Sequence, residues 1–269
     1  MTIFEAAKKG FAQTGKLMNV VVVFLVFNVV VGLISLPLAS PERAGDPGIV
    51  AVSVLSSILF FLIFVFLQGG ALGLVKDQLK SASASMAQFT EYGKKFYLRI
   101  LGLLLLYILI AVAIVLILSL ISAGILLVGD NMVTRSIVAM LVTVVAIAVI
   151  TFLLYPIYSI VAEDKGSVAA LKRGMEVAKA NFWKTLGLFA LMLVISLAIS
   201  LVVGFLTGIV SMPLPAEIGQ VLVALVNAAV QSYIPIVMMV AFMAFYLSLT
   251  AGEPVQVPGQ DTQIDEPAA

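Results

Sequence analysis

The chain has 269 residues, of which 62% are hydrophobic and only 11% are charged. A soluble protein of this length cannot bury that much apolar surface, so lipid must be the solvent for most of the chain. The sequence contains no His and no Cys, which excludes disulfides, thiolate or imidazole catalysis and most zinc or haem sites. The formal net charge is only +1, but the basic residues are distributed unevenly.

Six apolar segments are each long enough to cross the hydrocarbon core of a bilayer, which takes about 20 helical residues. None of these segments contains Asp, Glu, Lys, Arg or His. Their continuous apolar character, without alternation of period two, predicts helices and not barrel strands. The predicted spans are 17–38, 49–75, 100–122, 137–162, 185–209 and 221–250.

The connections between the spans alternate between long basic segments and short segments with few charges. The long segments 1–16, 76–99 and 163–184 contain 13 of the 15 Lys and Arg residues. The positive-inside rule places these three segments in the cytoplasm. We therefore expect a multi-pass protein of the cell inner (cytoplasmic) membrane with both termini in the cytoplasm.

The stretch 167–188 indicates how a basic segment enters a span. Its apolar residues recur at helical spacing, while its charges lie off that face. These apolar residues are Val168, Leu171, Met175, Ala178 and Phe182. The pattern predicts an amphipathic helix at the membrane surface that leads into a span.

The same unit, a surface helix followed by a hairpin of two spans, is predicted three times. Thr2-x-x-Glu5 and Ser85-x-x-Gln88 fit capping boxes, and Ser167 is the expected N-cap of the third surface helix. Every unit starts and ends on the same side of the membrane, which makes the repeats parallel. The fold class is therefore an all-α membrane protein with three such repeats. The units cover about 2–76, 85–162 and 167–250.

Small residues at four-residue spacing predict two places where helices approach closely. Span two contains Gly69-x-x-x-Gly73, and span five has a ridge of small residues. We expect both to pack within one molecule, with a dimer interface as the alternative. The ridge of span five consists of Ser196, Ser200, Gly204 and Gly208.

Span six is the most polar of the six and holds a candidate ligand site at Asn227, Gln231 and Tyr233. Amides in hydrocarbon must find hydrogen-bond partners, so these side chains predict a small polar site near the bilayer midplane. The alternative is hydrogen bonding between helices that fixes their register. Possible partners elsewhere in the spans are Asn19, Asn28, Gln68 and Tyr155.

The surface helices hold a second candidate site, for anionic lipid headgroups. A cation near an anionic membrane surface contributes about 1 kcal/mol to binding, and interfacial aromatic residues add anchorage. The alternative is general anchoring without lipid selectivity. The candidate headgroup residues are Lys94, Lys95, Lys172, Arg173 and Lys179. The candidate aromatic anchors are Phe4, Phe11, Phe89, Phe96, Phe182 and Trp183.

The stretch 251–269 follows the last span. It contains no Lys or Arg, four acidic residues and three prolines. This composition predicts a disordered acidic tail in the cytoplasm.

Three stretches carry a resemblance to a known group of proteins: Gly69-Gly70-Ala71-Leu72-Gly73, Tyr155-Pro156, and the helix-then-span pattern of 167–188. In this plan the chain resembles prokaryotic six-span proteins of unknown function, including the membrane domain found beside glycerophosphodiester phosphodiesterases. The resemblance implies an integral membrane domain. The spans and loops leave no room for the soluble hydrolase, so the resemblance does not extend enzymatic activity to this chain.

No constellation of nucleophile, base and acid is visible, and no metal-ligand cluster or phosphate-binding loop. We therefore expect a non-enzymatic protein without a cofactor and without nucleic-acid partners. The leading hypothesis is a protein that contacts membrane lipids or serves as a partner or scaffold for another membrane protein. The alternative is a transporter or permease for a small neutral or lipidic solute.

Overall fold

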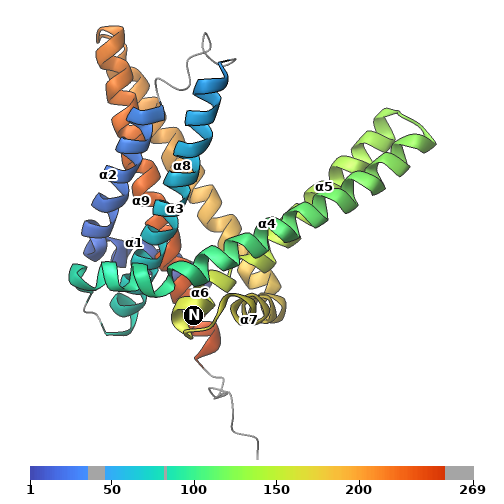
Figure 1. Ribbon diagram of the computed structural model, residues 1–269, viewed down its shortest axis with the longest axis horizontal. Coiled ribbons are helices and arrows are strands. Elements are labelled where there is room, and N and C mark those ends of the chain that lie inside the picture. Colours follow the sequence, from blue (N-terminus) through green and yellow to red (C-terminus); the bar gives the residue numbers. More distant parts are fainter. Residues whose placement is uncertain (36–45, 82–83, 252–269) are drawn as a thin grey trace, which may run out of the picture.

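The computed structural model of the protein describes residues 1–35, 46–81 and 84–251, and every regular element in these ranges is a helix (Figure 1). The first half of the chain holds α1 (Ile3–Thr14), the 3-10 turn η1 (Gly15–Leu17), α2 (Met18–Ser35), α3 (Pro47–Lys80), the 3-10 turn η3 (Met86–Gln88) and α4 (Phe89–Val128). The second half holds α5 (Met132–Leu153), α6 (Pro156–Ala162), α7 (Ser167–Ala180), α8 (Phe182–Ser211) and α9 (Ala216–Thr250).

Within the described residues, six helical stretches are long and apolar enough to cross a membrane, which confirms the six predicted spans. In three of them the apolar stretch continues through a short break between two elements. The stretches are Ile3–Ser35, Pro47–Lys80, Met86–Leu127, Met132–Ala162, Phe182–Ser211 and Ile218–Thr250. The protein is a multi-pass membrane protein.

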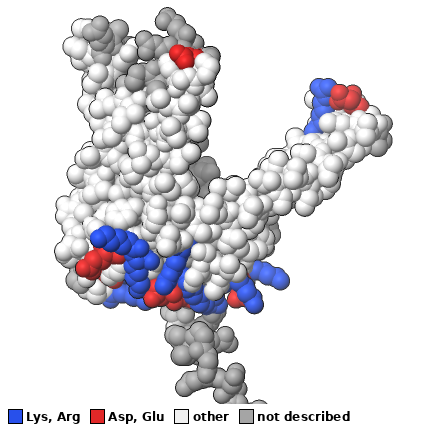
Figure 2. Space-filling view, in the orientation of Figure 1, with Lys and Arg blue, Asp and Glu red and all other residues white. Residues whose placement is uncertain are grey.

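The helices form two parts that diverge from a common base. The body consists of α1, α2, α3, α8 and α9, and the arm is the outer part of the α4–α5 hairpin, residues 108–150 (Figure 1). No side chain described in the arm is buried. An open notch separates the arm from the body (Figure 2).

The packed core lies at the base, where the two parts meet. It combines the ends of α3 and α9 with the start of α4 and the whole of α6. Fully buried side chains of this core include Leu72, Phe96, Ile100, Ile160 and Tyr246. Toward the opposite ends of α2, α3 and α8 most large apolar residues are exposed, as expected of helices whose solvent is lipid.

Glycines make the close helix contacts of the base. A Cβ at Gly73 of α3 would overlap the ring of Tyr92 in α4, and one at Gly70 would lie 2.8 Å from the carbonyl oxygen of Phe89. This contact confirms the predicted close approach at Gly69-x-x-x-Gly73. A Cβ at Gly174 of α7 would likewise overlap the backbone nitrogen of Pro156.

The predicted ridge of span five does not pack in this way. A Cβ added at Gly204 or Gly208 would meet no atom of the described chain within 4 Å. The prediction of close packing within one molecule is therefore wrong at these two positions, because α8 turns them toward open space. A small-residue pattern permits a close approach but does not select the helix that makes it.

Only one of the three predicted caps forms as expected. The capping box is present at Thr2, where the Glu5 carboxylate accepts from the Thr2 backbone at 2.8 Å. Ser85 precedes the 3-10 turn η3 and makes no side-chain cap, so the second box is wrong. Gly166 takes the N-cap position of α7, while the Ser167 hydroxyl donates to the Arg99 carbonyl at 2.7 Å.

The three predicted units follow the same order of elements but differ at their junctions. The turn η1 separates α1 from α2, and Asn181 separates α7 from α8, whereas α4 runs from surface helix into span as one helix of 40 residues. In the second half of each hairpin, α5 ends before Pro156 while α9 continues through Pro235. The predicted tail lies, from residue 252 onward, outside the described residues.

Candidate functional site

Charged side chains gather at the base of the molecule, while the surfaces above it are almost free of charge (Figure 2). The start of α1 and the end of α9 lie at this charged end (Figure 1). At the far tip of the arm, Arg135 forms an ion pair with Asp130 at 2.6 Å. This distribution matches the alternation of basic and sparsely charged connections in the sequence.

The loop between α6 and α7 holds the base of the arm in place. The Asp164 carboxylate pairs with Arg99 at 2.6 Å and with Lys95 at 3.2 Å, both on α4. Arg99 also donates to the Asp164 carbonyl at 2.9 Å. Partial desolvation acts to raise the pKa of Asp164, but the hydrogen bonds from Lys95 and Arg99 outweigh it and hold the pKa below its usual range.

The neighbouring Glu163 joins the same loop to α7 and α9. Its carboxylate pairs with Lys165 at 2.8 Å and with Arg173 at 3.4 Å, and it accepts a short hydrogen bond from the Tyr246 hydroxyl. Desolvation raises the pKa of this carboxyl, yet the bonds from Lys165 and Tyr246 lower it overall. This acidic pair is not among the predicted site residues, although two adjacent acids in a basic segment are a signal for a cluster of ion pairs.

The five candidate headgroup residues divide into two groups. Lys94, Lys172 and Lys179 are exposed at the charged end. Lys95 pairs with Asp164, and Arg173 pairs with Glu163. The first group is free to meet headgroups, whereas the second contributes to the ion pairs that hold the base together.

The candidate aromatic anchors divide in the same way. Phe4 and Trp183 are exposed, and the Trp183 side chain is 80% accessible. Phe89 and Phe96 are buried between α3 and α4, so an anchoring role in lipid is wrong for these two. Their burial follows from the glycine contacts of α3, which draw the start of α4 onto the protein core.

Helix α7 has two apolar faces with different partners. Small residues face the protein, whereas Val168 and Met175 from the predicted face are exposed. The face in contact with the protein consists of Ala170, Gly174, Val177 and Ala178. The larger apolar side chains are thus left for the membrane, alongside the exposed Lys172 and Lys179.

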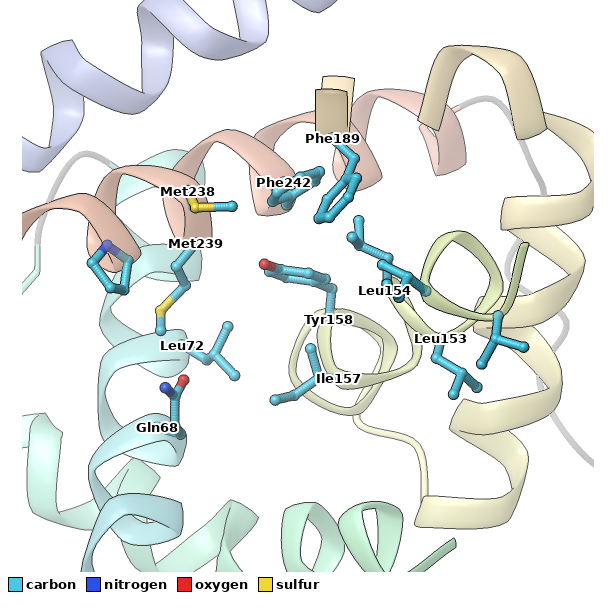
Figure 3. Close-up of a pocket in the computed structure, with 13 residues that line it drawn as sticks. Gln68, Leu72, Leu153, Leu154, Ile157, Tyr158, Phe189, Met238, Met239 and Phe242 are labelled. Carbon is cyan, nitrogen blue, oxygen red and sulfur yellow. The ribbon is translucent and has the colours of Figure 1, made fainter. Parts of the chain in front are cut away.

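A cavity of about 490 Å³ lies between the body and the base of the arm, at the foot of the notch. Figure 3 shows side chains that line it. Five helices contribute to its wall: α3, α5, α6, α8 and α9. The wall is largely apolar, and its residues include Leu72, Leu153, Phe189, Met239 and Phe242. The helix breaks between α5 and α6, just before Pro156, and residues on both sides of this break line the cavity.

Two polar side chains, Gln68 and Tyr158, point into the cavity (Figure 3). Tyr158 is only 7% exposed, yet its hydroxyl makes no hydrogen bond within the described ranges of the chain. Other tyrosines of the base do have partners. Tyr155 is 3.1 Å from the Thr185 hydroxyl, and the Tyr107 hydroxyl donates to the Leu153 carbonyl at 2.7 Å. Because the Tyr158 hydroxyl is accessible from the cavity and has no protein partner there, it is a donor available to a ligand.

The polar residues of span six lie outside this cavity. Asn227 and Gln231 are exposed, and Tyr233 is half-buried. Asn28, one of their predicted partners, instead donates to the Ser232 hydroxyl at 2.9 Å. A ligand site at the three candidate residues therefore stays a prediction. Tyr158 is not among the predicted site residues, and the local signal for it is the Tyr155-Pro156 break two residues earlier.

A family model described as a domain of unknown function (DUF7847) matches residues 14–249, which cover all six spans. The chain belongs to this family. No curated protein and no solved structure matches it. Nothing found for this DUF7847 member links it to the membrane domain beside glycerophosphodiester phosphodiesterases, so that resemblance is supported only as far as six apolar helices.

Proposed function

We propose that this protein is a non-enzymatic protein of the inner membrane that acts through contact with anionic membrane lipids. Its charged end and both termini lie in the cytoplasm. The observation that carries the proposal is the composition of the exposed surface of α7, where Lys172 and Lys179 accompany the exposed Val168 and Met175. A helix with this surface lies at the level of the headgroups, with its apolar side chains in the acyl region.

The attachment of α7 to the rest of the protein supports this placement. Gly174 seats the helix against the backbone at Pro156, and Arg173 ties it to Glu163. The helix therefore has its protein-facing side filled and its orientation set. Its two exposed lysines gain about 1 kcal/mol each from an anionic surface, without the cost of folding the helix on the membrane.

Lipid analysis by native mass spectrometry tests the proposal. The full-length protein is extracted gently from membranes that contain zwitterionic and anionic phospholipids. The double change Lys172→Gln and Lys179→Gln is expected to reduce retention of anionic lipid by roughly 30-fold, because about 2 kcal/mol of attraction is lost. Arg135→Gln removes a cation from the opposite end and serves as the control. Equal anionic retention in all three proteins contradicts the proposal.

A role as a membrane partner or scaffold is a second candidate, supported by the open surface of α8. Gly204 and Gly208 face open space and would allow a helix of another protein to approach closely. Large side chains at these positions are expected to release such a partner in a pull-down from native membranes. A transporter role is less well supported, since Asn227 and Gln231 do not line the cavity.

The common order of elements supports the proposal that the chain contains three parallel repeats. Each unit places its surface helix at the charged end and returns there after one hairpin (Figure 1). The differences at the junctions would then reflect separate adaptation of each unit. The second unit, with its continuous α4, provides the arm.

A further inference from the structure

We propose that the cavity at the foot of the notch binds one acyl chain of a membrane phospholipid, and that the Tyr158 hydroxyl donates a hydrogen bond to the ester carbonyl of that chain. The inference rests on the proposed function, contact with membrane lipids, and adds a specific site to it. It is carried by three observations: the notch, the unbonded hydroxyl and the depth of the cavity below the charged end.

The notch between body and arm must be filled in a membrane. Both of its sides carry apolar residues, and these residues would have no van der Waals contacts across the notch if it were empty. The cavity at its foot, about 490 Å³, falls within the range of about 300–1,000 Å³ that is usual for small-molecule sites. Its wall is largely apolar and includes Leu72 and Phe242, so it fits a hydrocarbon chain.

The polar atoms of the cavity determine which part of a lipid lies there. A pure hydrocarbon would leave the Tyr158 hydroxyl without a partner in a dry site, which is unfavourable. The ester carbonyl of a phospholipid supplies an acceptor at the head of an apolar chain. Gln68 is a second polar side chain that points into the cavity, at a separate place on its wall (Figure 3).

The depth of the cavity agrees with this assignment. Gln68 precedes Lys76 by eight residues in α3, which is about 12 Å along a helix axis. The Lys76 ammonium donates to the carbonyl of Val161 at 2.9 Å, and Val161 follows Tyr158 by less than one turn. Tyr158 thus lies just inside the charged end, near the boundary between headgroups and hydrocarbon, where ester carbonyls are found.

The site is formed before any lipid enters. The α3–α4 glycine contacts and the Asp164 ion pairs hold α4 at the base. The Tyr107–Leu153 hydrogen bond then fixes α5 against α4 at the level of the cavity. A preformed site does not spend binding free energy on ordering its walls.

Photocrosslinking in nanodiscs tests the inference. The full-length protein is reconstituted with a phospholipid that carries a diazirine on one acyl chain, illuminated and digested, and the labelled peptides are mapped by mass spectrometry. Ile150→Trp is expected to block the cavity and abolish labelling of the peptides that contain Phe189 and Met239. Ile147→Trp is the matched control, because Ile147 lies three residues away on α5 with similar exposure (42% against 45%) and is not part of the cavity wall.

Tyr158→Phe separates the hydrogen bond from the shape of the cavity. It is expected to lower cavity labelling about fivefold, the contribution of one net hydrogen bond. Tyr155→Phe removes a neighbouring hydroxyl that bonds Thr185 and does not line the cavity, and should leave labelling unchanged. Thermal unfolding of each variant identifies any loss that comes from misfolding.

Two outcomes overturn the inference: labelling spread evenly over all exposed apolar helices, or cavity labelling that survives Ile150→Trp. If cavity labelling is absent while Lys172 and Lys179 still select anionic lipid, only this inference fails. If both signals are absent, the proposed function fails as well.

Discussion

The base and the arm of this protein are built from the same apolar residue types, but only the base is packed as a protein interior. In the base, Gly73 and Gly174 bring helix backbones together, and the side chains around them are buried. In the arm, a Cβ added at Gly124 would meet no atom of the described chain within 4 Å, and no described side chain is buried. Hydrophobicity takes a helix into the bilayer, and close packing then depends on small residues in the right register.

A large-to-small change should separate the two regions most clearly. Leu103→Ala removes a fully buried side chain of the base and should lower the free energy of unfolding by about 2–5 kcal/mol, since it leaves a cavity. Leu120→Ala in the arm removes a side chain that already faces lipid, and we expect a change below about 0.5 kcal/mol. Equilibrium unfolding in mixed micelles measures both values. Equal losses would mean that the arm is packed against something in the folded protein.

The opposite change, small to large, should show the same contrast. Gly174→Leu places a side chain where a Cβ alone already overlaps the Pro156 backbone, and should cost about 1–3 kcal/mol. Gly124→Leu has open space around it and is expected to be neutral or slightly stabilising. The same unfolding experiment compares them. A stable Gly174→Leu variant would contradict the close contact between α6 and α7.

Lowering the pH should destabilise the packing of the base and leave the arm unaffected. The pKa values of Glu163 and Asp164 are lower in the folded protein than their usual values. Their ion pairs therefore stabilise the fold above about pH 4. This stabilisation is lost as the pH falls through the lower pKa values of the folded state. For these partly exposed groups we expect a loss of about 1 kcal/mol. Unfolding measured from pH 7 down to pH 3 records it.

Asp164→Asn provides the control for the pH experiment. The variant lacks one of the two carboxylates, so its stability should depend less steeply on pH than that of the unchanged protein. An unchanged pH dependence would show that the ion pairs to Lys95 and Arg99 contribute nothing measurable.

The smallest effect is expected at the tip of the arm. The ion pair between Asp130 and Arg135 is well formed, at 2.6 Å, but both side chains are largely exposed. Exposed pairs contribute little because water and salt screen them. Asp130→Asn should therefore leave the free energy of unfolding unchanged within the precision of the same micelle assay. A loss as large as that of Asp164→Asn would show that the two ion pairs are equivalent.

Local features of the sequence were enough to predict the spans and one helix cap. A run of about 20 residues without a charge has only one stable form in a bilayer, because every backbone group must be bonded within the segment. The Thr2 capping box is equally local, since both of its hydrogen bonds join residues three apart. These predictions needed no knowledge of what lies beside each helix.

Features that join distant parts of the chain could not be predicted in this way. The Arg99–Asp164 pair spans 65 residues, and the Glu163–Tyr246 bond spans 83. The candidate site depends on the same kind of contact, because five helices must converge before Tyr158 faces a cavity.

The sequence by itself determined the number of spans, the charged end and the absence of ionisable groups from the predicted spans, because each follows from the transfer of residues from water to lipid. Only the tertiary structure decided which helices pack and which diverge. Span two and span five carry similar small-residue patterns, yet Gly73 packs against Tyr92 while Gly204 faces open space. Such a pattern lowers the cost of contact equally at both places, and the register and direction of the neighbouring helices decide where contact is made.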